Sequence, residues 1–275
     1  MTGSKRNGWV YIPVAVLVAV TVLPFLWVVV SSFKTLEELY SLPLHLLPQH
    51  ATLANYVNVL YQSNIPRYFL NSTIVSLGST AIGLVFAIPA AYGLARFRFK
   101  GNGLLQSFIL ICHLLPTAAL IIPLYVMFGY LRLLNSYVGL ILAYLILTLP
   151  LSIWMLTGYF RSIPAELEEA AVIDGASRLT VLLRIMLPLS LPGVVVIVLY
   201  AFVATWNEFI FALSFASDPS VKTLPIGVAE FTTSTDTDWG AIMAASVIMT
   251  LPVAFVFFAL QRLFVGGLLA GAVKG

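Results

Sequence analysis

The sequence predicts an all-α membrane protein with six transmembrane helices, both termini in the cytosol and a single domain over residues 1–275. The first observation behind this is composition: 60% of the residues are hydrophobic and 9% are charged, against about 25% charged in soluble domains. The second is a mean hydropathy of +1.01, which leaves more apolar surface than a water-soluble fold of this size can bury. We therefore expect a multi-pass protein of the cell membrane.

Six charge-free windows predict the spans. A helix that crosses the hydrocarbon core needs about 20 apolar residues, and ionised side chains are costly there, so charged residues mark the window ends. The windows lie between Arg6 and Lys34, Arg67 and Arg96, Lys100 and Arg132, Arg132 and Arg161, Arg184 and Glu208, and Asp238 and Arg262. None alternates polar and apolar residues as the strands of a membrane barrel do. Each window is therefore expected to be helical.

The basic residues predict the orientation of these spans. When successive loops are assigned to opposite faces, four basic residues fall on one face, namely Lys34, Arg67, Arg132 and Lys222. The other ten fall on the second face: Lys5, Arg6, Arg96, Arg98, Lys100, Arg161, Arg178, Arg184, Arg262 and Lys274. Because cytosolic loops are the richer in Lys and Arg, both termini and the loop 161–188 are expected in the cytosol. The segment 34–67 is then a long external cap. The basic residues behind the net charge of +3 are expected to set the orientation of the spans, so no nucleic-acid partner is expected.

The loop 161–188 is the sizeable polar stretch on the predicted inner face. It holds four of the eleven acidic residues: Glu166, Glu168, Glu169 and Asp174. Carboxylates favour the first turn of a helix, and we expect Ser162 and Pro164 to mark its start. Gly175 can adopt the left-handed conformation that ends a helix, and Ser177 can cap the following stretch. The pattern predicts a helix, a glycine turn and a second helix across the membrane face.

This loop resembles the EAA signature of permease subunits from binding-protein-dependent ABC importers. Seven residues match it at fixed spacing: Glu169, Ala170, Ala171, Gly175, Ile185, Leu187 and Pro188. The resemblance extends over the chain and is most similar to the maltose-permease type of carbohydrate importers. Asn71-Ser72, the run 206–209 and the run 271–275 support it. It implies the ABC importer permease (type I) fold.

The resemblance also implies what the loop does. In that family the EAA helix is a coupling helix seated in a groove of the ATPase subunit, with Glu169 then acting as its anchor and Gly175 as its turn. The expected ATPase-coupling residues are Glu168, Glu169, Ala170, Ala171, Asp174 and Gly175. The Walker pattern is absent from the sequence, in which no Gly is followed by Lys. We therefore expect no enzyme activity and no cofactor in this chain, with ATP and Mg on the partner ATPase.

The resemblance implies that the chain forms one half of the translocation path of an ATP-driven importer. The expected solute is a sugar, and among sugars an oligosaccharide. The implied partners are a second homologous permease, two cytosolic ATPase subunits, an extracytoplasmic solute-binding protein and the lipid bilayer. One alternative is a glycerol-phosphate or other polyol permease. A phosphate calls for cations in its path, and no basic residue falls inside a window, which argues against this alternative. An ion-coupled secondary transporter is another, and it would need carboxylates at membrane depth.

Four polar residues near the window ends are candidates for the substrate path: Asn71, Ser72, Asn207 and Glu208. Glu208 is an acid inside an apolar stretch, which makes it a functional candidate by default. The alternative is an interfacial Glu that is hydrogen-bonded to a neighbouring span. For Asn71 and Ser72 the alternative is a hydrogen bond between helices, which is the commoner use of such residues in membranes. No His, Cys, Asp or Glu cluster has the spacing of metal ligands.

Overall fold

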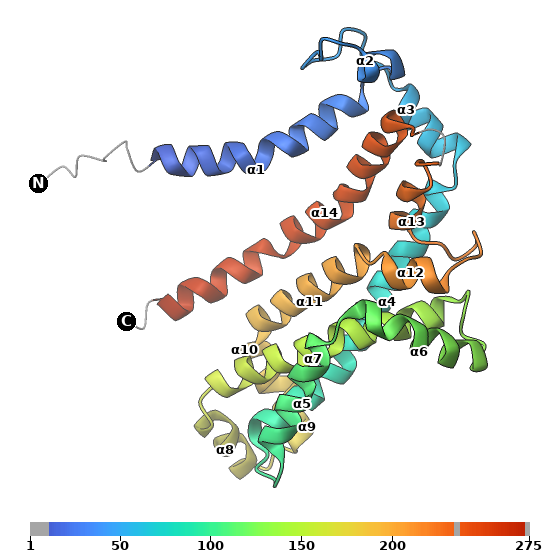
Figure 1. The fold of residues 1–275 in the computed structure, drawn as a ribbon. Helices are drawn as coiled ribbons and strands as arrows, with labels where there is room; N and C mark the ends of the chain where they lie inside the picture. Colours follow the sequence, from blue (N-terminus) through green and yellow to red (C-terminus); the bar gives the residue numbers. More distant parts are fainter. Residues whose placement is uncertain (1–10, 234–236, 273–275) are drawn as a thin grey trace, which may run out of the picture. The chain divides into compact units, whose positions relative to one another are not determined.

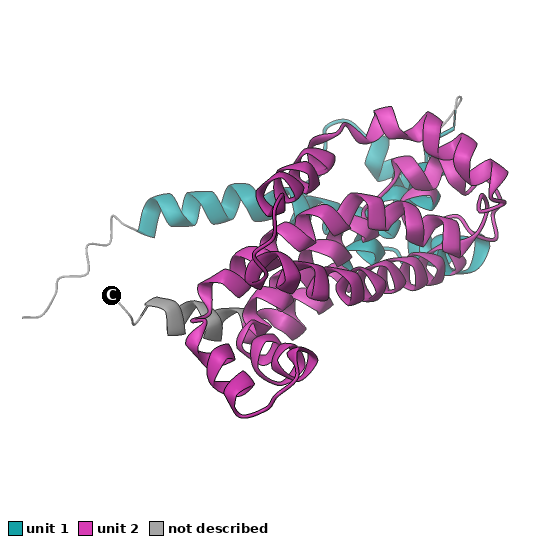
Figure 2. Ribbon diagram, turned by 90° about the horizontal axis from the view of Figure 1, so that it is seen from below, with its two compact units in different colours: residues 1–66, 227–251 teal, residues 67–226, 252–275 magenta. Residues whose placement is uncertain are grey.

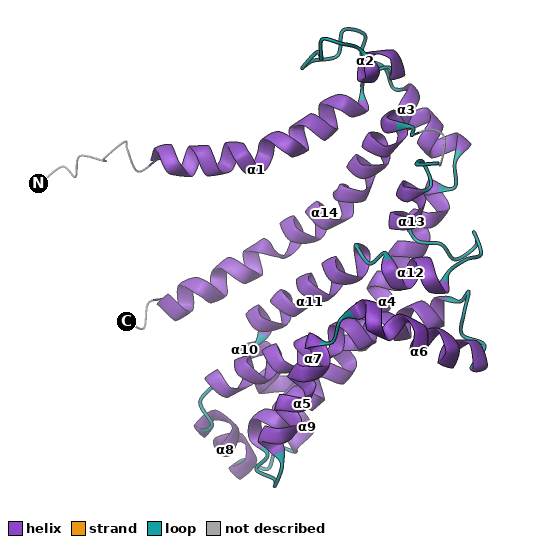
Figure 3. Ribbon diagram, viewed as in Figure 1, coloured by secondary structure: helices purple, strands orange, loops and turns teal. Residues whose placement is uncertain are grey.

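A computed structural model describes residues 11–233 and 237–272, with side chains described as far as residue 263. Its regular elements are helices, apart from an isolated bridge between Thr232 and Thr237, as Figure 3 shows. The predicted all-α class is confirmed for this part of the chain. The basic residues Lys5, Arg6 and Lys274 and the end of the run 271–275 lie outside the described residues, so the predicted cytosolic termini remain a prediction.

Four helices are long and apolar enough to cross a bilayer (Figure 1). They are α1 (Tyr11–Ser32), α4 (Ile65–Arg96), α7 (Tyr137–Ser162) and α14 (Trp239–Ala272). In α14 the candidate span is Trp239–Leu263. Two further windows hold bent pairs. The helices α5 (Asn102–Leu114) and α6 (Thr117–Tyr130) meet at 94°, and the segment Arg178–Leu189 meets α11 (Leu191–Trp206) at 80°. The described chain thus has four candidate spans, or up to six if each bent pair is one span.

Both windows are helical as expected, and a proline lies at each bend. Pro116 forces the preceding Leu115 out of the helical region, where it lies at φ −64 and ψ 132. Pro192 lies in the first turn of α11, where its missing N–H costs no hydrogen bond and a new helix can begin. By contrast, Pro89 and Pro150 lie inside α4 and α7, which continue through them.

The chain forms two compact units, coloured separately in Figure 2. Unit 1 comprises residues 1–66 and 227–251, with α1, the short helices α2 (Leu36–Tyr40) and α3 (Ala54–Val57), the π-helical turn η2 (Asn58–Gln62) and the first part of α14. Unit 2 comprises residues 67–226 and 252–275, with most of α4 and the elements α5 to α12. The short helix α13 (Leu224–Ala229) runs across the boundary between them.

The predicted external cap 34–67 folds around a buried lysine in unit 1. Lys34 is 2% exposed; its ammonium donates to the carbonyl of His45 at 2.5 Å and lies 4.2 Å from the ring centroid of Trp27. The Asn55 amide donates to the carbonyls of Ser32 and Lys34 at 2.9 and 2.8 Å. A buried cation needs such partners to offset its lost hydration. These contacts hold the segment against the end of α1.

The core of unit 2 is built on α7, which packs against α5 and α11. One cluster gathers buried side chains from α4, α7, α11 and the loop before α11, among them Tyr92, Leu156, Phe160, Met186 and Ile197. A second cluster joins α6 and α7 to α12 (Ile210–Phe215) through Phe128, Tyr144, Phe211 and Phe215. The loop after α7 carries α8 (Glu166–Ile173), α9 (Arg178–Val181), the π-helical turn η3 (Leu182–Met186) and α10 (Leu187–Leu189). The first cluster therefore supports the predicted coupling loop.

Candidate functional site

The helix predicted in the loop 161–188 is α8, and its boundaries follow from its ends. Glu166, Glu168 and Glu169 lie in its first turn, where carboxylates complement the positive end of the helix dipole. The expected start at Ser162 was wrong, because Ser162 is the last residue of α7 and its hydroxyl donates to the carbonyl of Tyr159 at 2.7 Å. Ala165 is the N-cap residue of α8 instead.

Gly175 ends α8 as predicted. Its φ is +86, and the amides of Gly175 and Ala176 donate to the carbonyls of Val172 and Ala171 at 3.0 and 2.9 Å. These two bonds form a Schellman motif, which satisfies the last carbonyls of the helix. Ser177 then caps α9, since its hydroxyl oxygen accepts from the amide of Thr180 at 3.2 Å. The turn between the two helices is therefore fixed at both ends by hydrogen bonds.

The helix α8 has an inner and an outer face. Glu168 is 4% exposed and Ala171 packs against the core cluster, so both face inward. The exposed residues of α8 and its turn are Glu166, Leu167, Glu169, Ala170, Val172, Ile173, Asp174 and Gly175, and Ile173 is 85% exposed. Of the six residues predicted to couple to the ATPase, the outer face brings four together. Glu168 and Ala171 are not among them.

Glu168 is held by three side chains from two other elements. Its carboxylate forms ion pairs with Nε of Arg96 at 3.0 Å and with a guanidinium nitrogen of Arg178 at 2.6 Å. The Tyr92 hydroxyl donates to the same carboxylate at 2.5 Å. Arg96 also donates to the carbonyl of Ile163 at 2.8 Å. The loop is thereby attached to the end of α4.

The predicted substrate-path residues Asn71 and Ser72 lie in α4 with their polar atoms occupied. The Asn71 amide donates to the carbonyls of Ser220 and Lys222 at 3.0 and 2.8 Å, and its oxygen accepts from the Tyr137 hydroxyl at 2.7 Å. The Ser72 hydroxyl accepts from the amide of Leu224 at 2.8 Å. Both residues are nearly fully buried. They hold the segment 220–224 against α4 and α7.

Glu208 and Asn207 do not lie in a helix, in contrast to the sequence expectation. The helix α11 ends at Trp206 with Asn207 as its C-cap. Asn207 is exposed, and its amide donates to the carbonyl of Val203 at 2.9 Å. The buried Glu208 carboxylate accepts from the amides of Phe211 and Ala212 at 2.8 and 3.0 Å, so it caps α12. A role of either residue in a substrate path stays a prediction.

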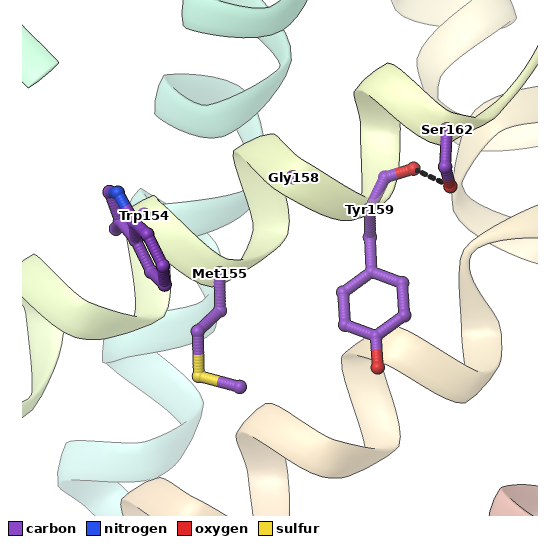
Figure 4. A pocket seen from close by; sticks show the side chains of 5 residues that line it. All are labelled: Trp154, Met155, Gly158, Tyr159 and Ser162. Atoms are coloured by element: carbon purple, nitrogen blue, oxygen red, sulfur yellow. Dashed lines mark hydrogen bonds between the residues drawn. The ribbon is translucent and has the colours of Figure 1, made fainter.

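Two hollows in unit 2 carry polar groups that sequence reasoning did not select. One, of about 190 Å³, lies at the bend between α5 and α6 and includes His113, Thr117 and Tyr200 in its lining. Pro116 signals that bend in the sequence, but the approach of Tyr200 from α11 has no local signal. The other, of about 360 Å³, follows α7 and is lined by Trp154, Met155, Gly158, Tyr159 and Ser162, drawn in Figure 4. Among the described residues, no three His, Cys, Asp or Glu side chains could hold a metal ion.

A family model for the inner membrane component of binding-protein-dependent transport systems matches residues 80–269. That match covers more than half of the chain, including the loop 161–188. The chain belongs to this family. It is a multi-pass membrane permease and a transport component, and the resemblance found in the EAA loop is confirmed at the level of the family.

The permease is similar to two named relatives over almost its full length. It is 38% identical over 265 residues to the sulfoquinovosyl glycerol transport system permease protein SmoH of Agrobacterium fabrum, covering 96% of this chain and 93% of the relative. It is 40% identical over 265 residues to the trehalose/maltose transport system permease protein MalG of Thermococcus litoralis, covering 95% of each.

The fold of the permease is also found in a solved structure. A chain of a bacterial ABC transporter involved in the import of the acidic polysaccharide alginate aligns with a TM-score of 0.82 at 20% identity. The alignment covers 96% of the permease and 100% of that chain. At this identity the likeness supports the ABC importer permease fold alone.

Proposed function

We propose that this permease forms one half of the translocation path of an ATP-driven sugar importer and couples to a cytosolic ATPase through α8. The observation that carries the proposal is the outer face of α8. That face gathers Glu169 and Asp174 beside the exposed apolar side chains of Val172 and Ile173. An apolar patch rimmed by charge is typical of a protein interface.

The rigid mounting of α8 supports a mechanical role. The Schellman turn at Gly175 and the Ser177 cap fix the end of the helix, and the Glu168 ion pairs fix its inner face. A docking element must transmit displacement without deforming. Since the sequence has no Walker pattern of its own, ATP and Mg bind the partner, and this chain needs no cofactor.

The substrate class that we propose is carbohydrate, and within that class an oligosaccharide. The names of the relatives SmoH and MalG, a sulfoquinovosyl glycerol and a trehalose/maltose transport system permease, support this class. A glycerol-phosphate or polyol permease is the alternative, and a phosphate would call for cations in the path. No Lys or Arg falls inside any of the six charge-free windows.

The assembly we propose has two permeases, two ATPases and an extracytoplasmic binding protein. This chain contributes six spans, counting each bent pair as one, with both termini in the cytosol as the distribution of basic residues favours. The folded cap 34–67 would then meet the binding protein on the outer side. A single domain over residues 1–275 is part of the same proposal.

The test is the substitution Glu169→Lys in the tagged importer. It places a cation on the proposed docking face, so the permease should insert in the membrane but recover little ATPase when purified in mild detergent. The exposed Glu37 on α2 offers a matched control, because Glu37→Lys makes the same charge change in the external cap and should recover ATPase at the wild-type ratio. Normal ATPase recovery together with normal sugar uptake in Glu169→Lys would remove the coupling assignment.

A further inference from the structure

Glu168 differs from the other acids of α8 in being buried. Its side chain is 5% exposed, whereas Glu166 and Glu169 in the same turn are exposed. A carboxylate at this depth cannot serve as a contact for a partner that docks on the outer face. It needs internal partners to remain charged, and the structure supplies Tyr92, Arg96 and Arg178.

Those partners belong to different elements. Tyr92 and Arg96 lie one helical turn apart at the end of α4, with Arg96 as its last residue, and Arg178 is the first residue of α9. Arg96 additionally holds the linker before α8 through the carbonyl of Ile163. The guanidinium carbon of Arg178 lies 5.9 Å from the ring centroid of Phe97, which follows α4. One carboxylate on α8 therefore contacts the start of α9, in the same loop, and the end of α4, which is more than 70 residues earlier in the sequence.

Other contacts of α8 are with α9, with η3 and, through Ala171, with the first core cluster. The helix is eight residues long, which is too short for it to be stable alone. From α8, Ala171 packs against the core cluster. An alanine buries little apolar area. Among these contacts, the Glu168 ion pair with Arg96 links α8 directly to α4.

We propose that Glu168 is a positioning residue that ties the coupling helix to α4, so that a displacement of α8 moves the end of α4 with it. The inference deepens the proposed function and rests on it. The outer face of α8 receives the motion of the ATPase, and the Glu168 cluster passes that motion to a transmembrane helix. Loss of the cluster leaves the docking face in place but allows α8 to move without α4.

The experiment compares Glu168→Gln with Glu166→Gln in the complete importer reconstituted in vesicles. Both variants remove one carboxylate from the same turn, and only Glu168 contacts Arg96. The measured quantity is the number of solute molecules imported per ATP hydrolysed, which does not depend on how much complex is folded. For Glu168→Gln we expect ATPase recovery at the wild-type ratio and an import per ATP reduced roughly three- to thirtyfold, the range for single residues that carry coupling. Glu166→Gln should keep the wild-type value.

A second pair of variants tests the cluster itself. Arg96→Gln should reduce import per ATP as Glu168→Gln does, and the double variant should reduce it no further than the more severe single one, because both changes break the same link. Tyr92→Phe removes one hydrogen bond without removing a charge, so a smaller reduction in the same direction is expected. Tyr92→Phe tests the cluster if the charge variants yield too little protein to measure.

The possible outcomes separate this inference from the proposed function. An unchanged import per ATP in Glu168→Gln, or fully additive effects of Glu168→Gln and Arg96→Gln, would overturn the inference and leave the docking face intact. Loss of ATPase recovery in Glu168→Gln would also overturn the inference, because it would show that the cluster is needed for docking and not for passing motion to α4. Normal ATPase recovery and uptake in Glu169→Lys contradicts the docking proposal, on which the inference depends.

Discussion

The buried carboxylate of Glu208 is hydrogen-bonded to the backbone at the start of α12. Its two oxygens accept from the amides of Phe211 and Ala212, which would otherwise be unpaired donors at the start of α12. The sequence showed an acid at the end of an apolar window, but it did not reveal that the helix ends at Trp206. The cap depends on that break, which local residue preferences do not specify.

The cap predicts a graded effect on stability. Glu208→Ala removes both acceptors and should lower the free energy of unfolding by about 0.5–2 kcal/mol, the range found when side-chain hydrogen bonds to the first turn of a helix are lost. Glu208→Gln keeps one acceptor oxygen and should lose less. Thermal unfolding of the purified permease in detergent measures both. An Ala variant as stable as the wild type would show that the two hydrogen bonds contribute nothing.

A close approach between α7 and α11 gives a second prediction at a single residue. A Cβ at Gly193 would overlap the ring of Tyr159, whereas a Cβ at Gly158 would meet nothing within 4 Å. Gly193→Ala should therefore destabilise the permease by about 1–3 kcal/mol, because the Tyr159 ring or the backbone of α11 has to shift. Gly158→Ala, one residue from Tyr159, should be neutral or slightly stabilising because Ala is the better helix former. Equal melting temperatures for the two variants would contradict this packing.

At the scale of the element, the sequence predicted the acidic first turn of α8, its glycine stop and the Ser177 cap because these are local features. It did not predict which face of α8 is buried. Glu168 and Glu169 are neighbours of the same type that point about 100° apart, and Arg96 from α4 and Arg178 from α9 pair with the buried Glu168. That convergence is tertiary, so the sequence grouped Glu168 with the docking residues.

The glycine turn after α8 makes a prediction of its own. Gly175 and Gly101 both have positive φ, +86 and +92, and a Cβ at either would meet nothing within 4 Å. Replacement by Ala therefore introduces backbone strain alone, about 1–2 kcal/mol at each site. Gly175→Ala should in addition lower ATPase recovery, because it distorts the end of the proposed docking helix. Gly101→Ala should show the strain without that loss. Co-purification and thermal unfolding of the two variants would separate these effects, and equal ATPase recovery would argue against a role for the turn in docking.

At the scale of the whole molecule, composition and charge-free windows were enough to place the apolar helices but not their bends. Windows are bounded by charges, whereas the break between α5 and α6 lies in the middle of one at Leu115 and Pro116. Pro150 lies in an equally apolar setting, and α7 continues through it. A proline permits a bend, and the packing of neighbouring helices decides whether it occurs.

The proposed topology can be tested with single cysteines, because the sequence has one native cysteine, Cys112. In a Cys112→Ser background, Tyr61→Cys places a thiol in the external cap at a site that is 82% exposed. Arg98→Cys places one at an exposed site on the turn after α4. If cytosolic loops carry the excess of basic residues, a membrane-impermeant maleimide should label Tyr61→Cys in intact cells. It should label Arg98→Cys only after the membrane is opened. The reverse pattern would invert the chain and place α8 on the outer side, where no ATPase could reach it, so this one labelling experiment also tests the premise of the coupling proposal.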